Sequence, residues 1–165
     1  MDNQRLLVWA TFGMLLWLAW RSASPDPRSK SGSLAPFRFA VVSGLVVLVL
    51  QIGLGGWTSA NYAALACPDF PTCQGTWWPN TNFSEGFVLW REIGVDYEGG
   101  VLDMPSRTAI HLAHRIGALV TFLLLGFLAL RLIRHRAVRQ DGLVLGALLL
   151  AQVALGIQNV LLQLP

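Results

Sequence analysis

The chain has 165 residues, of which 54% are hydrophobic and 13% are charged. An ordinary water-soluble domain of this length carries more charge, so the composition argues against a soluble domain and favours a membrane protein. The net charge of +3 does not indicate a nucleic-acid partner, because the charges are segregated by loop. In a membrane protein that segregation encodes orientation.

Four apolar segments follow one another along the chain and predict an all-α integral membrane protein, since about 20 helical residues cross a bilayer. Three of them are long enough to span, whereas the first is short and predicts only a partial helix. We therefore predict one membrane domain with a partial helix at 6–20, a cytoplasmic linker at 21–38, a transmembrane helix at 39–58, an external loop at 59–107, a transmembrane helix at 108–134, a cytoplasmic loop at 135–141 and a transmembrane helix at 142–164.

The loop charges alternate in sign along the chain. Residues 21–38 and 131–141 each hold four basic residues against one acidic residue, which places both in the cytoplasm. Residues 57–107 hold six acidic residues against two basic ones and belong outside. This topology starts the chain on the outer side, although the short first segment has neither a basic anchor nor a signal-peptide start. We therefore expect the chain to be a fragment, its first segment being the tail of a longer helix.

A glutamine followed by glycines marks the outer end of the second segment. Residues 51–56 read Q-I-G-L-G-G, and three glycines in four residues allow a backbone or a flat ligand to approach closely. Glycine is also common in membrane helices, so that explanation stays open. Residues 152–156 repeat the pattern Q-x-x-L-G, which is compatible with two equivalent helices in a duplicated architecture and also with chance.

The external loop is too long for an idle connection in a compact protein. Its many aromatic residues favour a position on the membrane interface or a lid over a cavity. Residues 83–93 predict a short amphipathic stretch that rests Phe87, Trp90 and Ile93 on the membrane or on the mouth of the helices.

The same loop contains the chain's two cysteines, Cys67 and Cys73. An oxidising outer compartment favours a disulfide between them. A structural bridge and a redox-active one both remain open, but the spacing is not the C-x-x-C of thiol oxidoreductases.

Three polar side chains stand at the outer end of the third segment, where they are costly unless they bind something: His111, His114 and Arg115. The histidines are three residues apart and share one helical face. Neutral imidazole suits haem iron, copper or zinc, and haem needs only one protein ligand on each face. No third histidine or nearby cysteine completes a zinc or copper set. A packing role for either histidine stays open.

Arg115 is a candidate partner for a haem propionate, with snorkelling to lipid phosphate as the alternative. A six-coordinate haem needs a second axial ligand. His135 lies in the cytoplasmic loop, on the wrong side of the membrane. The second ligand is therefore His111, a group other than histidine, or a residue absent from this chain, and we favour the last.

Several motifs together resemble haem A synthases, particularly the second half of the proteobacterial type. They are the run over residues 50–75 with its C-P-D-F-P-T-C string, Trp77-Trp78, Glu98-Gly-Gly100 and I-H-L-A-H-R at 110–115. The resemblance covers most of residues 37–165. It implies a four-helix-bundle haem domain, one of two related bundles in an eight-helix protein that oxidises a methyl group of haem O to give haem A for cytochrome oxidase.

Residue by residue, the resemblance implies that His114 ligates haem iron and that Cys67 and Cys73 are the paired cysteines of the outer loop. His111 stands where the other half of such enzymes carries a glutamate implicated in catalysis. This chain would then hold the cofactor haem b instead of oxidising the substrate, with His114, His111 and Arg115 as its cofactor-binding residues and no catalytic residue of its own.

We therefore expect an oxidoreductase component of haem A biosynthesis in the bacterial inner membrane, inactive when isolated. Haem O and haem A would be its substrate and product in the complete enzyme, and haem O synthase and cytochrome oxidase assembly factors its candidate partners beside membrane lipid. A small b-type cytochrome, possible as a homodimer sharing two copies of His114, is the main alternative. A membrane thiol oxidoreductase using the cysteines and a non-functional truncation are the others.

Overall fold

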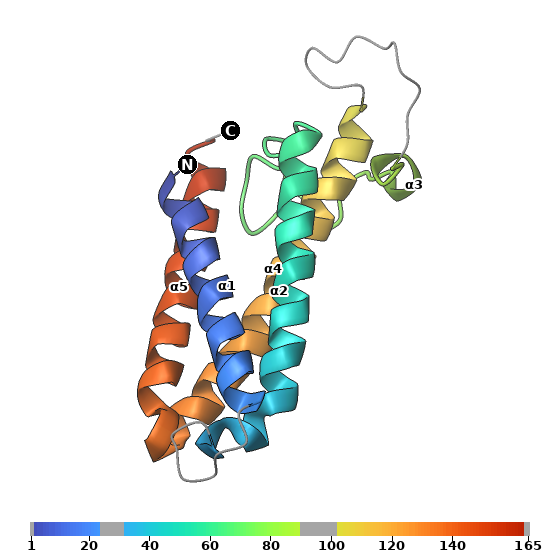
Figure 1. Ribbon diagram of the computed structural model, residues 1–165. Coiled ribbons are helices and arrows are strands. Elements are labelled where there is room, and N and C mark those ends of the chain that lie inside the picture. The colour runs from blue at the N-terminus through green and yellow to red at the C-terminus, as the bar shows by residue number, and fades with distance from the viewer. Residues whose placement is uncertain (1, 24–31, 90–101, 164–165) are drawn as a thin grey trace. The chain divides into compact units, whose positions relative to one another are not determined.

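The structure is a computed structural model of the chain, and it describes residues 2–23, 32–89 and 102–163. Its long elements are all helices and the described residues form no strand, which confirms the predicted all-α class (Figure 1). In chain order the elements are α1 (Asp2–Ala23), the 3-10 helix η1 (Gly32–Phe37), α2 (Arg38–Ala60), α3 (Phe83–Gly86), α4 (Met104–Arg134), the 3-10 helix η2 (Arg136–Val138) and α5 (Arg139–Leu161).

Four stretches of the described chain are long and apolar enough to cross a membrane: Leu6–Ala23, Leu34–Ala60, Met104–Arg134 and Arg136–Leu161. The prediction of a short first helix is therefore wrong, because α1 has 22 residues. The predicted segment covered only the apolar residues 6–20. The helix extends beyond them at both ends, because intrahelical hydrogen bonds form between backbone groups and do not require apolar side chains. At its end the Ser22 hydroxyl donates to the Ala19 carbonyl at 2.7 Å, which keeps that polar residue compatible with the helix.

The other boundaries differ from the predicted ones by a few residues. Residues 32–37 of the predicted linker form η1, which contains Pro36. Helix α4 begins at Met104 and not at residue 108, because Asp103 caps it: the Asp103 carboxylate accepts from the Ser106 backbone N–H at 3.0 Å. Helix α5 begins at Arg139, ahead of the predicted residue 142.

The chain divides into two compact units. Unit 1 consists of residues 1–50 and 119–155, and unit 2 consists of residues 51–118 and 156–165. Helices α2, α4 and α5 contribute residues to both.

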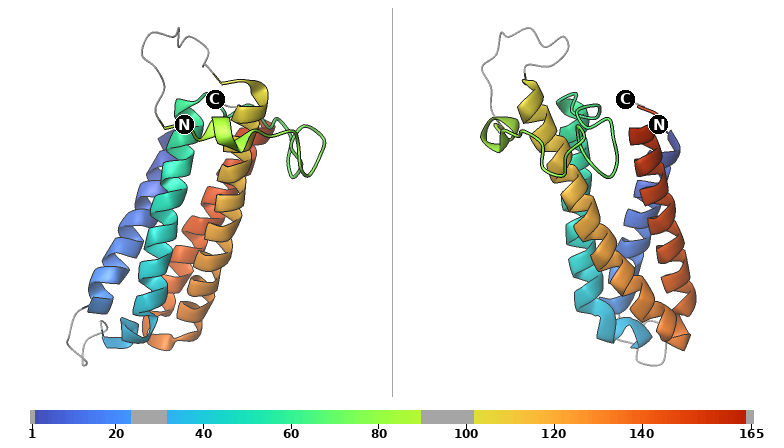
Figure 2. Two further views of the ribbon diagram at one scale, coloured as in Figure 1. Left: turned by 90° about the vertical axis from the view of Figure 1, so that its right-hand side faces the viewer. Right: turned by 180° about the vertical axis from the view of Figure 1, so that it is seen from behind.

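Unit 1 is built by close packing of helices. Helices α1 and α5 lie side by side (Figure 2). The Thr11 hydroxyl donates to the Gln152 side chain between them at 3.1 Å. Helices α4 and α5 meet at Gly142, where an added Cβ would lie 2.7 Å from the Ile133 backbone nitrogen. The fully buried side chains of this unit include Leu15, Leu18, Leu34, Val41, Leu125, Leu132 and Leu145.

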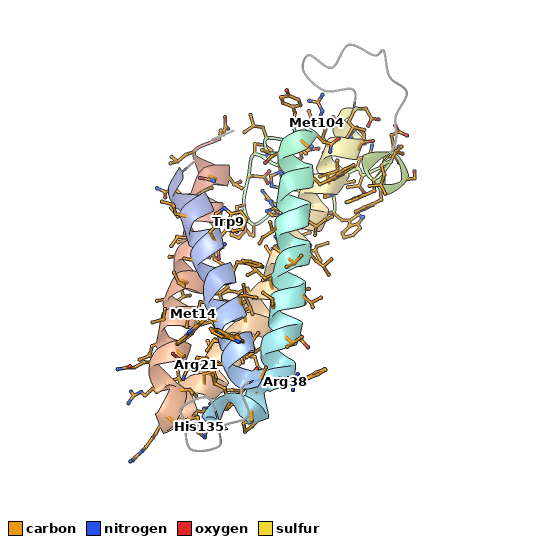
Figure 3. All side chains as sticks on the ribbon, in the orientation of Figure 1. Trp9, Met14, Arg21, Arg38, Met104 and His135 are labelled. Atoms are coloured by element: carbon orange, nitrogen blue, oxygen red, sulfur yellow. A yellow bond between two sulfur atoms is a disulfide. The ribbon has the colours of Figure 1, made fainter. Side chains whose placement is uncertain are left out.

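Two polar residues of unit 1 are marked in Figure 3. Arg21 pairs with Asp141 at 3.3 Å and lies over the Trp17 ring, 4.3 Å from its centroid. His135 follows the end of α4 and meets the Phe37 ring edge to face, with 5.7 Å between ring centroids. His135 therefore belongs to unit 1, whereas the residues predicted to bind a cofactor belong to unit 2.

Unit 2 joins the Gln51–Ala60 end of α2, the beginning of α4 and the loop between them. The Trp57 indole N–H donates to the Gly86 carbonyl at 2.9 Å, which ties the four-residue helix α3 to α2. Trp57 and Phe87 pack against a small core of Ala63, Leu102 and Ile110. Among the described residues of the predicted amphipathic stretch at 83–93, Phe83–Gly86 form a helix. Its Trp90 and Ile93 lie outside the described residues, as does Glu98-Gly-Gly100.

Candidate functional site

Helix α4 carries three of the predicted site residues within five positions, and all three belong to unit 2. His111 and His114 lie on one helical face, as their spacing predicts. Their hydrogen-bond partners nevertheless differ, and so does the nitrogen that each ring can offer to a ligand.

His114 is held by a glutamine of α2. The Gln51 side-chain Nε2 lies 3.0 Å from the His114 Nδ1 and 3.1 Å from the His114 carbonyl oxygen. A carbonyl oxygen only accepts, so the Gln51 amide donates to both atoms. The His114 Nδ1 is therefore an acceptor, and in the neutral ring the proton is carried by Nε2.

Two glycines make room for this pair. A Cβ at Gly55 would lie 3.3 Å from the His114 Cε1, and a Cβ at Gly117 would lie only 2.3 Å from the Gln51 Oε1. Close approach therefore accounts for Gly55 in the glycine string. The Gln51 Oε1 itself is buried and has no hydrogen-bond partner within the described part of the chain. An unpaired buried acceptor is rare in proteins.

His111 is buried, with 4% of its surface exposed. Its Nδ1 lies 2.9 Å from the Ala63 carbonyl oxygen. Because the carbonyl can only accept, Nδ1 carries the proton and Nε2 is the basic nitrogen of the neutral ring. The two histidines of this face thus have opposite arrangements of proton and lone pair.

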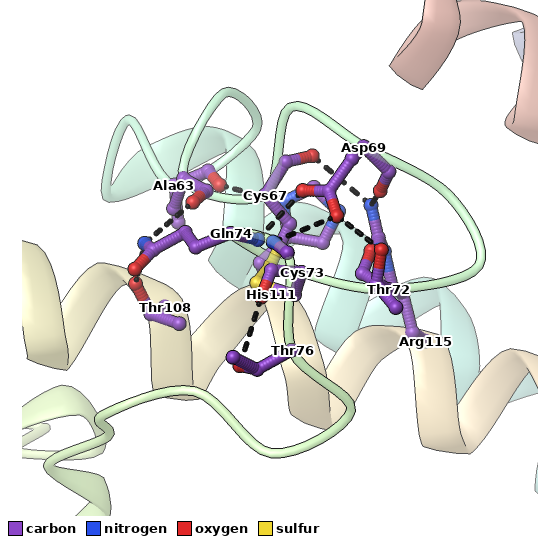
Figure 4. The surroundings of a disulfide bond; sticks show 12 residues. Ala63, Cys67, Asp69, Thr72, Cys73, Gln74, Thr76, Thr108, His111 and Arg115 are labelled. Carbon is purple, nitrogen blue, oxygen red and sulfur yellow. Dashed lines mark hydrogen bonds between the residues drawn. A yellow bond between two sulfur atoms is a disulfide. The ribbon is translucent and has the colours of Figure 1, made fainter.

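Arg115 reaches into the loop that contains the cysteines. Its guanidinium donates to three backbone carbonyls, those of Thr72 at 2.8 Å, Cys67 at 3.0 Å and Asp69 at 2.8 Å (Figure 4). Charge-assisted hydrogen bonds of this kind are stronger than neutral ones. Arg115 therefore fastens the loop to α4. Its Nε is buried and has no partner among the residues that the structure describes, so one donor remains for a further acceptor.

The predicted disulfide is present, with the Cys67 and Cys73 sulfurs 2.00 Å apart. Inside the loop, the Asp69 carboxylate accepts from the Gln74 backbone N–H at 2.6 Å, the Gly75 N–H at 3.0 Å and the Thr72 hydroxyl. These hydrogen bonds, that from Thr72 foremost, hold the pKa of the Asp69 carboxyl below its usual range.

A second contact joins this loop to α4. The Gln74 side chain donates to the Ala66 carbonyl and to the Thr108 hydroxyl, both at 3.0 Å. The loop is therefore closed covalently by its disulfide and attached to α4 at Thr108 and Arg115, one helical turn on either side of His111.

The sequence interpretation missed the partners of these residues. Gln51 was recognised only as part of a glycine string, and Asp69 and Gln74 were not singled out at all. A glutamine within an apolar helix was the available signal, because such a residue needs a polar partner. No group of three or more His, Cys, Asp or Glu side chains that could hold a metal ion occurs in the described ranges.

Comparison with known proteins gives two matches. A family model described as "COX15-CtaA: Cytochrome oxidase assembly protein" matches residues 6–165. A heme A synthase from Shewanella oneidensis is 48% identical over 133 residues, which cover 81% of this chain and 39% of that relative. The chain thus spans well under half the length of this curated relative. No solved structure matches the chain.

The family match and the helices point the same way. The match extends over all four stretches that are long and apolar enough to cross a membrane, so the chain is a multi-pass membrane protein. The chain belongs to the COX15-CtaA family of cytochrome oxidase assembly proteins.

Proposed function

We propose that this chain takes part in haem A synthesis by holding a cofactor haem b, with His114 as an axial ligand. The observation that carries the proposal is the environment of His114, combined with 48% identity to a heme A synthase. The His114 imidazole packs against Gly55 of α2, and its Nδ1 accepts from the Gln51 amide. Metal-binding histidines are usually oriented by donating their other ring N–H to an acceptor, and the Gln51 side chain offers such an acceptor in its unpaired Oε1.

The residues present fit a haem. Gly55 faces the His114 ring without a side chain, and a flat macrocycle needs such clearance beside its ligand. The unpaired Gln51 Oε1 and Arg115 Nε are polar atoms that await a partner. Bound haem b would supply one-electron chemistry, which suits the relay of electrons toward the oxidation of another haem.

Arg115 has two roles in this proposal. Its three carbonyl contacts order the disulfide loop, and its remaining Nε–H is the donor for a propionate. In this proposal the Cys67–Cys73 disulfide has a structural function: it fixes the conformation of the loop that Arg115 attaches to α4. Snorkelling of Arg115 to lipid phosphate is disfavoured, because its guanidinium is engaged by backbone carbonyls.

The wider activity is also part of the proposal. In the complete enzyme, haem O would be the substrate and haem A the product, delivered for the assembly of cytochrome oxidase. The chain would lie in the bacterial inner membrane with its disulfide loop outside. The reason is that basic residues cluster where α4 ends and α5 begins, which is the end of α4 that does not carry this loop: Arg131, Arg134, Arg136 and Arg139. Family membership supports this role over a b-type electron carrier or a thiol oxidoreductase.

The direct test is the haem content of the chain expressed in a host that makes haem O and purified from membranes in detergent. We expect His114→Ala to lower bound haem about tenfold or more, since an axial bond is lost. The matched control is His135→Ala, which removes a histidine of unit 1 and should leave haem content unchanged. Equal haem content in the two variants would remove the ligand assignment.

A further inference from the structure

Within the described chain the Gln51 amide makes two hydrogen bonds, and both go to His114. The amide nitrogen donates to the His114 ring and to the His114 backbone carbonyl. The amide oxygen is buried without a partner there, packed where Gly117 has no side chain. The amide is therefore half satisfied, with its donors used and its acceptor idle.

This orientation is the wrong one for ligation through Nε2. A neutral imidazole that accepts at Nδ1 carries its proton on Nε2 and has no lone pair there. His111 illustrates the other state, because its Nδ1 donates to the Ala63 carbonyl and its Nε2 is the basic nitrogen. Without a change at Gln51, His114 is not ready to bind a metal through Nε2.

We propose that Gln51 is a positioning residue that controls His114: its amide holds the ring in the Nε2–H tautomer, and it turns over to accept from Nδ1–H when His114 ligates iron. The iron-bound part of this inference rests on the proposed function. The ring loses the proton from Nε2 and takes one up at Nδ1, so its net protonation is unchanged. The turned amide uses the Oε1 acceptor that is idle in this structure.

Turning the amide is physically reasonable at this position. The two ends of a glutamine amide have nearly the same shape, so exchanging them needs no new space. The Gly117 position keeps that space open, because a Cβ there would lie 2.3 Å from the present Oε1. Turning places Oε1 beside the His114 carbonyl oxygen and leaves the amide N–H groups where Oε1 now lies, so the cost is a repulsive oxygen–oxygen contact and unpaired donors. The pairing of Oε1 with Nδ1–H and the ligation of iron by Nε2 together offset this cost.

The first experiment needs no haem. The full chain is labelled with nitrogen-15 histidine, placed in detergent at pH about 8, above the ordinary titration range of imidazole, and the protonated ring nitrogen of each histidine is read by NMR. We expect His114 to carry its proton on Nε2 and His111 to carry it on Nδ1. A proton on the His114 Nδ1 in the wild-type chain would overturn the inference.

Two substitutions sharpen this result. Gln51→Leu removes both donors, and we expect the His114 ring to become a mixture of tautomers. Gln152→Leu is the matched control, because it alters the same Q-x-x-L-G pattern in unit 1 and should leave both rings unchanged. An unaltered His114 tautomer in Gln51→Leu would show that Gln51 does not set it.

The second experiment adds protohaem to the purified chain. Gln51→Glu presents only acceptors when ionised and imposes Nδ1–H, so we expect about tenfold tighter haem binding than in the wild type and a lower reduction potential. Equal affinity and potential would overturn the turning step. If the wild-type chain binds no haem, the proposed haem-binding function is wrong. The NMR measurement of the His114 tautomer still tests separately whether Gln51 sets that tautomer.

Discussion

Gln51 and Gln152 begin the same five-residue pattern, yet the two glutamines have different surroundings. The Gln51 amide donates to the His114 ring and backbone in unit 2, and its oxygen is idle. In unit 1 the single proton of the Thr11 hydroxyl is shared between the Gln152 oxygen and the Leu7 carbonyl of its own helix. The first glutamine orients the His114 ring, whereas the second links two helices.

The two units differ in the same way as a whole. The described residues of unit 1 are mostly in long helices, which satisfy their own backbone groups, so stability comes from apolar packing and close approach at glycines. Unit 2 contains an irregular loop whose backbone carbonyls need donors, and Arg115 and Gln74 supply them. A substitution should therefore act through packing in unit 1 and through hydrogen bonds in unit 2.

The largest effect is expected for Arg115→Met. The variant removes three charge-assisted hydrogen bonds from loop carbonyls. Because the side chain is half-buried, we expect the loop to lose about 3 kcal/mol of local stability, which corresponds to about 100-fold faster amide exchange. Hydrogen exchange of residues 66–76 measures it. Arg131→Met, on the same helix in unit 1, is the control, and equal exchange in both variants would contradict the role of Arg115.

The next effect belongs to unit 1. In Gly142→Ala the new Cβ would lie 2.7 Å from the Ile133 nitrogen and 2.8 Å from the Ala129 carbonyl oxygen, and backbone atoms of a helix cannot yield easily. We expect a loss of about 2 kcal/mol, typical of overpacking. Unfolding in denaturing detergent, followed by helical circular dichroism, gives the value. Gly13→Ala, where a Cβ meets nothing within 4 Å, should instead be neutral or slightly stabilising.

A smaller effect is expected from the ion pair of unit 1. Asp141→Asn removes the partner of Arg21, whose charge also lies over the Trp17 ring. Both side chains are mostly but not fully buried, so we expect a loss of about 1 kcal/mol or less. The same detergent unfolding measures it, and high salt should reduce the difference. A loss as large as that of Gly142→Ala would mean that polar contacts dominate unit 1 as well.

The smallest effect is a pH dependence in unit 2. The pKa of Asp69 is lowered below 3.8 by its hydrogen bonds, so its contribution to loop stability is present above the unfolded pKa and is lost as the pH falls through the folded value. The amide shifts of Gln74 and Gly75 should therefore titrate with a midpoint below 3.8. Asp69→Asn should abolish that step. A midpoint at or above the ordinary aspartate value would show that the loop contacts do not form in solution.

Much of the fold could be predicted from apolar length and charge. Segments of about 20 apolar residues can satisfy their backbone in a membrane only as helices, so three of the four helices were found within a few residues of their ends. Helix α1 was judged too short, because its polar first residues and Arg21 hid the continuation. The cysteine pair was also predictable, since both residues lie six positions apart in the loop assigned to the oxidising outer side.

The sequence by itself determined an all-α membrane protein with two histidines on one helical face and a disulfide loop nearby, because periodicity and composition act locally. Only the tertiary structure decided that His111 donates to a carbonyl while His114 accepts from Gln51, and that Arg115 holds the loop. These pairings join residues far apart in the chain. Their geometry depends on how α2, α4 and the loop meet, which no local pattern encodes.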